Sequence, residues 1–294
     1  MTAPTGLRVL YGDGVSWREL DDRVLVRRHE SFDVNVGLVV GDGHCLVIDT
    51  REHLSAGQEL AAAVRQVTAA PWTVVNTHAH FDHFMGNEAF LPGEIWSLDR
   101  TKDIIERYGE VQRQVMIHVA QQQQRADLVA GLEETSLTPP NRTFLPPATV
   151  LDIGGRQVTL RHLGRAHTDN DIMISVAGSD VLFAGDLVEE GAPPAFEDAY
   201  PIAWGPSLDG LLALVSGPVV PGHGDVVDAA FVREQRELHA RVADAARGPA
   251  TSVRGLPDEV ATIALTRARA ELAGTLALRT PQEVLAQFGL SWDR

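Results

Sequence analysis

The stretch Thr77-His78-Ala79-His80-Phe81-Asp82-His83 decides how the rest of this sequence is interpreted. It follows the short apolar run 72–75, which is typical of a buried strand. In a locally extended chain, alternate residues point the same way, so His78, His80 and Asp82 are expected to face one space. His83 joins them once the chain turns into the following helix. Because neutral imidazole and carboxylate are ligands that zinc accepts, the stretch predicts a metal site at a strand end.

The order of the predicted elements favours mixed sheets covered by helices. Turns such as Gly41-Asp42-Gly43 and Gly154-Gly155 predict hairpins, which an all-parallel sheet lacks. Strands are expected at 34–40, 45–48, 72–75, 94–98, 148–153, 156–163, 171–177, 180–185 and 219–220. Helices are expected at 54–67, 101–134, 207–215 and from about 228 onward. Ser207 is the expected N-cap of the third helix.

Three later residues extend the set of candidate metal ligands. His167 comes just after an expected strand, Asp186 ends the run 181–184, and His223 lies between two glycines after another short strand. Each residue taken alone is equally consistent with a turn histidine, a helix-capping aspartate or a loop residue. Their order behind the first motif favours ligands.

The pattern His78-x-His80-x-Asp82-His83, followed by the three later residues, resembles the signature of the metallo-β-lactamase-fold hydrolase superfamily over about residues 30–230. The resemblance implies an α/β protein with an αββα four-layer sandwich, in which helices flank two mixed β-sheets. We therefore predict a metallo-β-lactamase-like domain over 1–230 with a helical insertion at 101–134. A C-terminal helical extension over 231–294 is expected to pack on it.

The resemblance also implies a centre of two divalent metal ions. It places His78, His80 and His167 on the first metal, Asp82, His83 and His223 on the second, and Asp186 between them. The expected metal is Zn²⁺, with Fe and Mn also compatible. Two cations lower the pKa of bound water from ~15.7 towards ~7, which would give a bridging hydroxide at neutral pH. Asp82 and Asp186 are the catalytic candidates.

Two further expectations concern the surroundings of the metals. Asp49 follows the apolar run 46–48 and is expected to hydrogen bond a ligand histidine. The segment 188–204 contains Phe196, Tyr200 and Trp204, and aromatic loops beside catalytic strand ends often bind substrate. These three are therefore the substrate-binding candidates, although the same aromatics are equally suited to packing the loop onto the core.

Asp186 narrows the predicted reaction. True β-lactamases of this fold have cysteine or serine at this position, so a dedicated β-lactamase is disfavoured. The glutathione-binding stretch of hydroxyacylglutathione hydrolases is not recognisable after His223, and Asp186 is not closely followed by the tyrosine of acyl-homoserine-lactone lactonases. We predict a hydrolase that cleaves an ester, thioester, lactone or amide of a small molecule. The alternatives are a mononuclear non-haem iron enzyme resembling persulfide dioxygenases and a non-catalytic metal-binding protein.

Composition limits the partners and the location. The net charge of −15 repels phosphate backbones and anionic membrane surfaces, so no nucleic-acid or membrane partner is expected. No apolar stretch approaches the ~18 residues of a membrane span, and no export signal is recognisable, so a cytoplasmic protein is expected. Cys45, the only cysteine, is predicted to be a buried thiol. The helices after residue 228 are expected to shield the sheets or to form the subunit contact of a homodimer.

Overall fold

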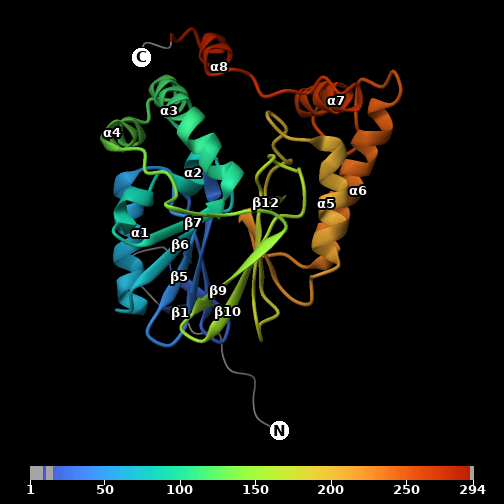
Figure 1. The fold of residues 1–294 in the computed structure, drawn as a ribbon. Helices are drawn as coiled ribbons and strands as arrows, with labels where there is room; N and C mark the ends of the chain where they lie inside the picture. Colours follow the sequence, from blue (N-terminus) through green and yellow to red (C-terminus); the bar gives the residue numbers. More distant parts are fainter. Residues whose placement is uncertain (1–8, 11–15, 292–294) are drawn as a thin grey trace.

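The computed structural model of the protein describes residues 9–10 and 16–291 (Figure 1). Two β-sheets pack face to face, and helices cover the outer face of each sheet. The predicted αββα four-layer sandwich is therefore confirmed, and both sheets are mixed.

The first sheet contains eight strands in chain order. β1 to β5 are antiparallel neighbours, whereas β5 to β8 are parallel. The strands are β1 (Val9–Leu10), β2 (Trp17–Asp21), β3 (Val24–Arg28), β4 (Asn35–Val40), β5 (Cys45–Ile48), β6 (Trp72–Val75), β7 (Glu94–Leu98) and β8 (Arg142–Phe144). Four of these strands were not predicted from the sequence: β1, β2, β3 and β8.

The second sheet contains five strands in the order β13-β12-β11-β10-β9. Only β12 and β13 are parallel neighbours within it. Its strands are β9 (Ala148–Ile153), β10 (Arg156–Arg161), β11 (Met173–Val176), β12 (Leu182–Glu189) and β13 (Val219–His223). Gly154 and Gly155 form the predicted hairpin turn with φ of 55° and 80°, a region that favours glycine.

Side-chain alternation along the strands of the first sheet gives an apolar core on each of its two faces. In β5, Cys45 and Val47 face α1 (Leu54–Val67), while Leu46 and Ile48 face the second sheet. All four are at most 2% exposed, and burying one such aliphatic side chain contributes roughly 1.5–3 kcal/mol. The buried thiol predicted for Cys45 is confirmed.

The helices form two outer layers and a group at one end of the sandwich (Figure 1). α1 packs on the first sheet, α5 and α6 pack on the second, and α7 packs on α5 and α6. The bounds of the remaining helices are α2 (Phe81–Phe84), α3 (Asp99–Gln122), α4 (Ala126–Glu134), α5 (Pro201–Leu212), α6 (Ala229–Ala246), α7 (Asp258–Leu272) and α8 (Pro281–Gln287). Two single turns of 3-10 helix lie at Ser31–Asp33 and Asn87–Phe90.

Two helical predictions need correction. The insertion at 101–134 contains two helices, α3 and α4, because the chain turns at Gln124 with φ of 57°. Ser207 is not an N-cap, since α5 begins at Pro201, whose fixed φ suits a first helical turn. The Ser207 hydroxyl instead donates to the Arg165 carbonyl over 2.9 Å.

The last part of the chain crosses the open end of the sandwich. After α7 it runs back towards the first half of the molecule, where α8 lies against α3 (Figure 1). The rings of His118 on α3 and Phe288 after α8 meet edge to face at 6.3 Å. The domain boundary expected at residue 230 stays a prediction.

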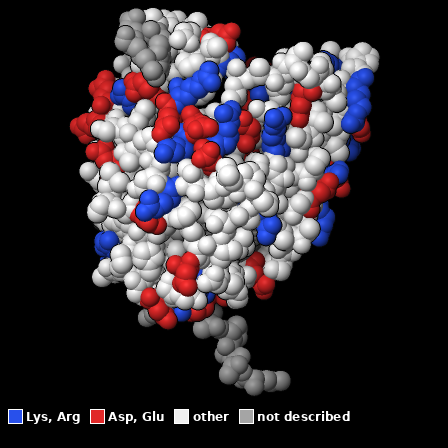
Figure 2. Space-filling model, in the orientation of Figure 1, with Lys and Arg blue, Asp and Glu red and all other residues white. Residues whose placement is uncertain are grey.

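Figure 2 shows that acidic and basic side chains are intermingled over one face of the molecule. None of the helices in the described part of the chain is long and apolar enough to cross a membrane.

Candidate metal centre

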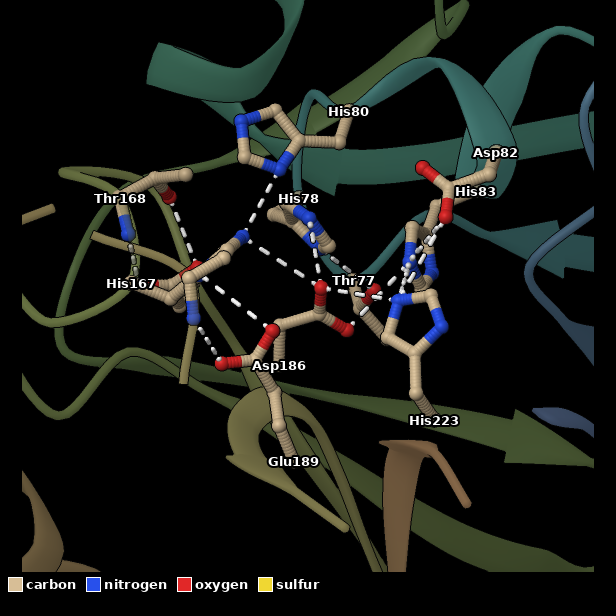
Figure 3. Close-up of polar contacts among 12 residues, drawn as sticks. Thr77, His78, His80, Asp82, His83, His167, Thr168, Asp186, Glu189 and His223 are labelled. Atoms are coloured by element: carbon tan, nitrogen blue, oxygen red, sulfur yellow. Dashed lines mark hydrogen bonds and ion pairs between the residues drawn. The ribbon is translucent and has the colours of Figure 1, made fainter. Parts of the chain in front are cut away.

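The structure brings all seven predicted ligand side chains together at one end of the two sheets (Figure 3). His78 and His80 lie in the loop after β6, and Asp82 and His83 lie on the single turn of α2. The second sheet supplies the others from the β10–β11 loop, from within β12 and from the end of β13; these are His167, Asp186 and His223. Both sheets therefore contribute to the site.

The seven side chains form two groups that share one carboxylate. Each residue offers one donor atom, and within each group these atoms lie within 4.8 Å of one another. The groups are His78, His80, His167 and Asp186, and Asp82, His83 and His223. Asp186 also reaches the second group, because its Oδ1 lies 3.3 Å from His83 Nε2 and its Oδ2 lies 3.2 Å from His223 Nε2.

The ring nitrogens that point away from the site are held by acceptors. His83 Nδ1 donates to Asp49 Oδ2 over 2.9 Å, and His223 Nδ1 donates to the Phe32 carbonyl over 2.7 Å. His80 Nε2 donates to Asp198 Oδ2 over 3.0 Å. In a neutral ring, such a partner fixes the tautomer, and the opposite nitrogen presents a lone pair to the centre.

Asp49, at the end of β5, forms hydrogen bonds with both ends of the histidine-rich stretch, at Thr77 and at His83. Its Oδ1 accepts from the Thr77 backbone N–H over 2.7 Å, and its Oδ2 accepts from the Thr77 hydroxyl over 2.8 Å and from His83. Its φ of 65° turns the chain sharply after β5, so the carboxylate sits directly beneath the loop. Asp49 is 2% exposed, and its burial raises the pKa of the carboxyl group.

The donor set fits divalent cations for two reasons: some of its buried donor atoms have no hydrogen-bond partner in the described part of the chain, and His78 is kept neutral. His78 Nε2 and Asp186 Oδ1 are buried and have no hydrogen-bond partner among the described residues. Burial lowers the pKa of His78 well below its ordinary value, which leaves a neutral ring with a free lone pair. Burial alone would also lower the pKa of His83, but the carboxylates around it, Asp186 first, raise it well above the ordinary value. Imidazole and carboxylate donors in this mixture suit zinc, iron or manganese.

Gly222 allows β13 to pass directly beside Asp186. A Cβ atom at this position would lie 1.7 Å from Asp186 Oδ1 and 3.0 Å from the Asp186 backbone nitrogen. The carboxylate at the centre thus occupies space that any other residue at 222 would fill.

The comparisons agree with this geometry. A family model described as the metallo-beta-lactamase superfamily matches residues 30–223. The chain belongs to this superfamily. A search of curated protein sequences found no significant match.

Solved structures of metallo-beta-lactamase superfamily proteins share the fold. TMB-1 is 19% identical, with a TM-score of 0.62, and the alignment covers 78% of this chain and 99% of that chain. DIM-1 metallo-beta-lactamase is 17% identical with a TM-score of 0.59, covering 77% and 96%. A metallo-beta-lactamase from Pontibacter korlensis is 20% identical with a TM-score of 0.58, covering 80% and 99%. At these identities the likeness concerns the fold alone.

The three predicted substrate-binding aromatics need correction in this metallo-beta-lactamase superfamily member. Phe196 and Trp204 are 1% and 0% exposed and belong to the core between the second sheet and its helices. Trp204 packs behind His167, with ring centroids 5.6 Å apart. Tyr200 is 6% exposed and lies under the Arg165 guanidinium. None of the three lines the cavity at the metal centre, because the loop packs its aromatics inward.

The same core contains His239, a buried titratable residue. Its ring stacks on Trp204 at 4.3 Å, and neither nitrogen has a hydrogen-bond partner within the described structure. Burial lowers the pKa of His239 to about 3, whereas an unfolded histidine titrates near 6.5. Below pH 6.5 the histidine binds a proton in the unfolded state but not in the folded state. The free energy of unfolding therefore decreases as the pH falls from 6.5 towards 3.

We therefore expect His239→Phe to reduce the acid sensitivity of folding. Between pH 7 and pH 5 the wild type should lose about 2 kcal/mol more unfolding free energy than this variant. Urea titrations in a chelator at both pH values measure the difference without a contribution from metal release. His44→Gln is the control, because it removes a half-buried imidazole that shares a hydrogen bond with Thr73 and lies outside the core around Trp204. Equal pH dependence of the His239 variant and the wild type would contradict the prediction.

Two carboxylates beside the ligands were not predicted from the sequence. Asp198 holds His80, and Glu189 Oε1 lies 4.0 Å from His167 Nδ1. Glu189 follows Asp186 by three positions and points to the same end of the sheet. Asp198 lies in the loop before α5 and carries no spacing signal, because only the fold brings it to His80.

We expect Asp198→Ala to weaken metal binding without removing a ligand. Loss of the acceptor frees the His80 ring to rotate and to change tautomer, and such losses typically cost about 10- to 100-fold in metal affinity. Competition with a chromophoric zinc chelator measures the affinity. Asp209→Ala removes a surface carboxylate that pairs with Arg236 over 2.8 Å, and it should leave the zinc affinity at the wild-type value. Equal affinities of all three proteins would contradict the positioning role of Asp198.

Proposed function

We propose that this protein is a dinuclear metal-dependent hydrolase that cleaves an ester, thioester, lactone or amide of a small molecule. The single observation that carries the proposal is the position of Asp186 between two groups of histidines. A carboxylate shared by two groups suits a pair of cations, because its negative charge offsets their mutual repulsion. Membership in the metallo-beta-lactamase superfamily supports the same assignment.

In this proposal His78, His80 and His167 would hold one ion, Asp82, His83 and His223 would hold the other, and Asp186 would serve both. Bound divalent ions, most simply Zn²⁺, make water acidic enough to ionise near neutral pH and polarise a substrate carbonyl. Hydrogen bonds to Asp49 and to the Phe32 carbonyl orient the rings of His83 and His223 so that their Nε2 atoms face the centre, and most of the ligand side chains are buried.

Asp82 is the side chain that we assign to proton handling. It lines the cavity, and its Oδ2 lies 3.5 Å from His223 Nε2. Hydrolysis adds the water oxygen to the acyl carbon, breaks the bond to the leaving group and transfers the proton of the water to the departing atom. A carboxylate that faces both the centre and the cavity can accept that proton and return it.

Metal analysis and a substrate panel test the proposal. Full-length protein loaded with zinc, manganese or iron should bind two ions per chain and hydrolyse at least one class among aryl esters, thioesters, lactones and amides. Chelation should abolish the activity, and added metal should restore it. Two outcomes would contradict the proposal: one iron per chain with oxygen consumption on a thiol substrate, and two bound ions without turnover of any acyl compound.

A further inference from the structure

The metal centre opens into a cavity of about 580 Å³. One side is formed by α3, and the opposite side is formed by α7, α8 and the segment between them. Apolar side chains from both sides line it, including Val111, Val115, Met116, Leu278, Val284 and Phe288. This volume suits a small organic molecule, and these walls favour an apolar chain.

Two arginines of the C-terminal helices line the same cavity, Arg267 on α7 and Arg279 just before α8. Arg267 is half-buried, and its Nε donates to the Ala199 carbonyl over 2.7 Å, which fixes the guanidinium in place. Its Nη2 has no acceptor among the residues that the structure describes. Arg267 is therefore anchored at one edge, and donors at its other edge stay available.

The buried carboxylates near Arg267 accept hydrogen bonds from groups other than this arginine. Asp198 accepts from His80, and Glu271 accepts from the Ile202 and Ala203 backbone N–H groups at the start of α5. Burial lowers the pKa of Arg267, and the charge of Arg279 acts in the same direction. Glu197 also lines the cavity, but its side chain is exposed to solvent. An anion placed between the two guanidinium groups would relieve their repulsion and the desolvation of Arg267.

We propose that the substrate is an amphipathic acyl compound whose apolar acyl chain lies between α3 and α8 and whose far end carries a carboxylate bound by Arg267 and Arg279. This inference rests on the proposed hydrolase function, because it assumes that the acyl group is the part that enters the cavity. Arginine binds carboxylates through paired, charge-assisted hydrogen bonds, which gives the site both affinity and direction.

The test compares charged and neutral acyl chains of equal length. The probes are phenyl half-esters of dicarboxylic acids of four to ten carbons and phenyl esters of the matching fatty acids. In the wild type, kcat/KM should favour the half-ester at one or more lengths. Arg267→Gln should lower that preference about 10- to 100-fold, and Arg279→Gln should lower it in the same direction.

Arg269→Gln is the matched control. Arg269 lies on the same helix and also donates to backbone carbonyls, those of Gly248 and Ala250, but it does not line the cavity. This variant should keep the wild-type preference. A wild type that prefers the neutral ester at every length, or an Arg267 variant with the wild-type preference, would overturn the inference while leaving the hydrolase function intact.

A binding measurement separates the two proposals. Calorimetric titration with suberate, an eight-carbon dicarboxylate, should give a dissociation constant at least about 10-fold weaker for Arg267→Gln than for the wild type and for Arg269→Gln. If no ester is cleaved but this difference is found, the carboxylate site stands and the proposed reaction fails. Equal suberate affinities of all three proteins would overturn the carboxylate site, whatever the activity.

Discussion

Replacement of Asp186 by alanine is expected to reduce hydrolysis by about 10³-fold or more and to leave fewer than two metal ions per chain. Asp186 approaches imidazoles of both groups, with Oδ2 also 3.4 Å from His167 Nε2 and 3.6 Å from His78 Nε2. Without this carboxylate, nothing offsets the repulsion between two cations held close together. Loss of several kcal/mol of transition-state stabilisation corresponds to a rate effect of this size.

Asp186→Asn is the informative companion variant. The amide keeps the shape and one carbonyl oxygen but loses the charge and one acceptor atom. We expect it to retain more metal than the alanine variant and to remain far less active than the wild type. Metal content by mass spectrometry, kcat/KM on the best substrate and far-ultraviolet circular dichroism are measured together. An alanine variant that is folded, carries two ions and keeps wild-type activity would rule out the shared-carboxylate arrangement.

The second large effect is expected from Gly222→Ala, which adds one methyl group. The new Cβ would meet Asp186 Oδ1 at 1.7 Å, far inside van der Waals contact, and would also press on the Asp186 backbone. The carboxylate must rotate or β13 must move away from β12, and a displacement of about 1 Å at a catalytic group can cost about 100-fold in rate. Forcing an extra methyl group into this packed site should also cost about 1–3 kcal/mol of stability.

Gly210→Ala provides the matched control for this substitution. Gly210 lies within α5, and a Cβ at this position would lie 3.4 Å from the Leu163 side chain, which is ordinary van der Waals contact. The same methyl group here should leave catalysis at the wild-type rate and raise stability by up to about 1 kcal/mol, because alanine suits a helix interior. Thermal unfolding and kcat/KM of both variants are the measurements. A Gly222 variant with full activity and two bound metals would show that the clash is relieved without moving Asp186.

Much of the fold could be predicted because the strands around the site carry strong local signals. β5 and β6 are short runs of buried aliphatic residues, and Gly154-Gly155 marks a hairpin. The strands β1 to β3 lie at the start of the first sheet, and the polar residues in β2 (Trp17–Asp21) hide the alternation expected of a strand. The start of α5 was misplaced because Ser207 looks like a cap, whereas Pro201 begins the helix.

The candidate ligands could be located from sequence because a compact histidine-rich motif follows a buried strand and the three later residues follow it in the order of a known signature. The surroundings could not, because they depend on tertiary packing. Phe196 and Trp204 are residue types typical of a binding loop, but both side chains pack into the core behind His167. Asp198 reaches His80, and Arg267 reaches the cavity, only because α7 and the loop before α5 fold over the same end of the sandwich. No periodicity or spacing in the sequence predicts that α7 and the loop before α5 come together at this end.

The crossing of the chain from α7 to α8 places the two arginines of the cavity outside the part of the sequence that contains the ligand groups. Every residue in the two ligand groups falls between positions 78 and 223, while Arg267, Arg279 and Phe288 come afterwards. Exchange of the later stretch between homologous proteins would therefore alter which compounds are accepted and leave the ion-holding residues in place. Substitutions in the later stretch could therefore change the preferred substrate while the residues of the two ligand groups stay the same.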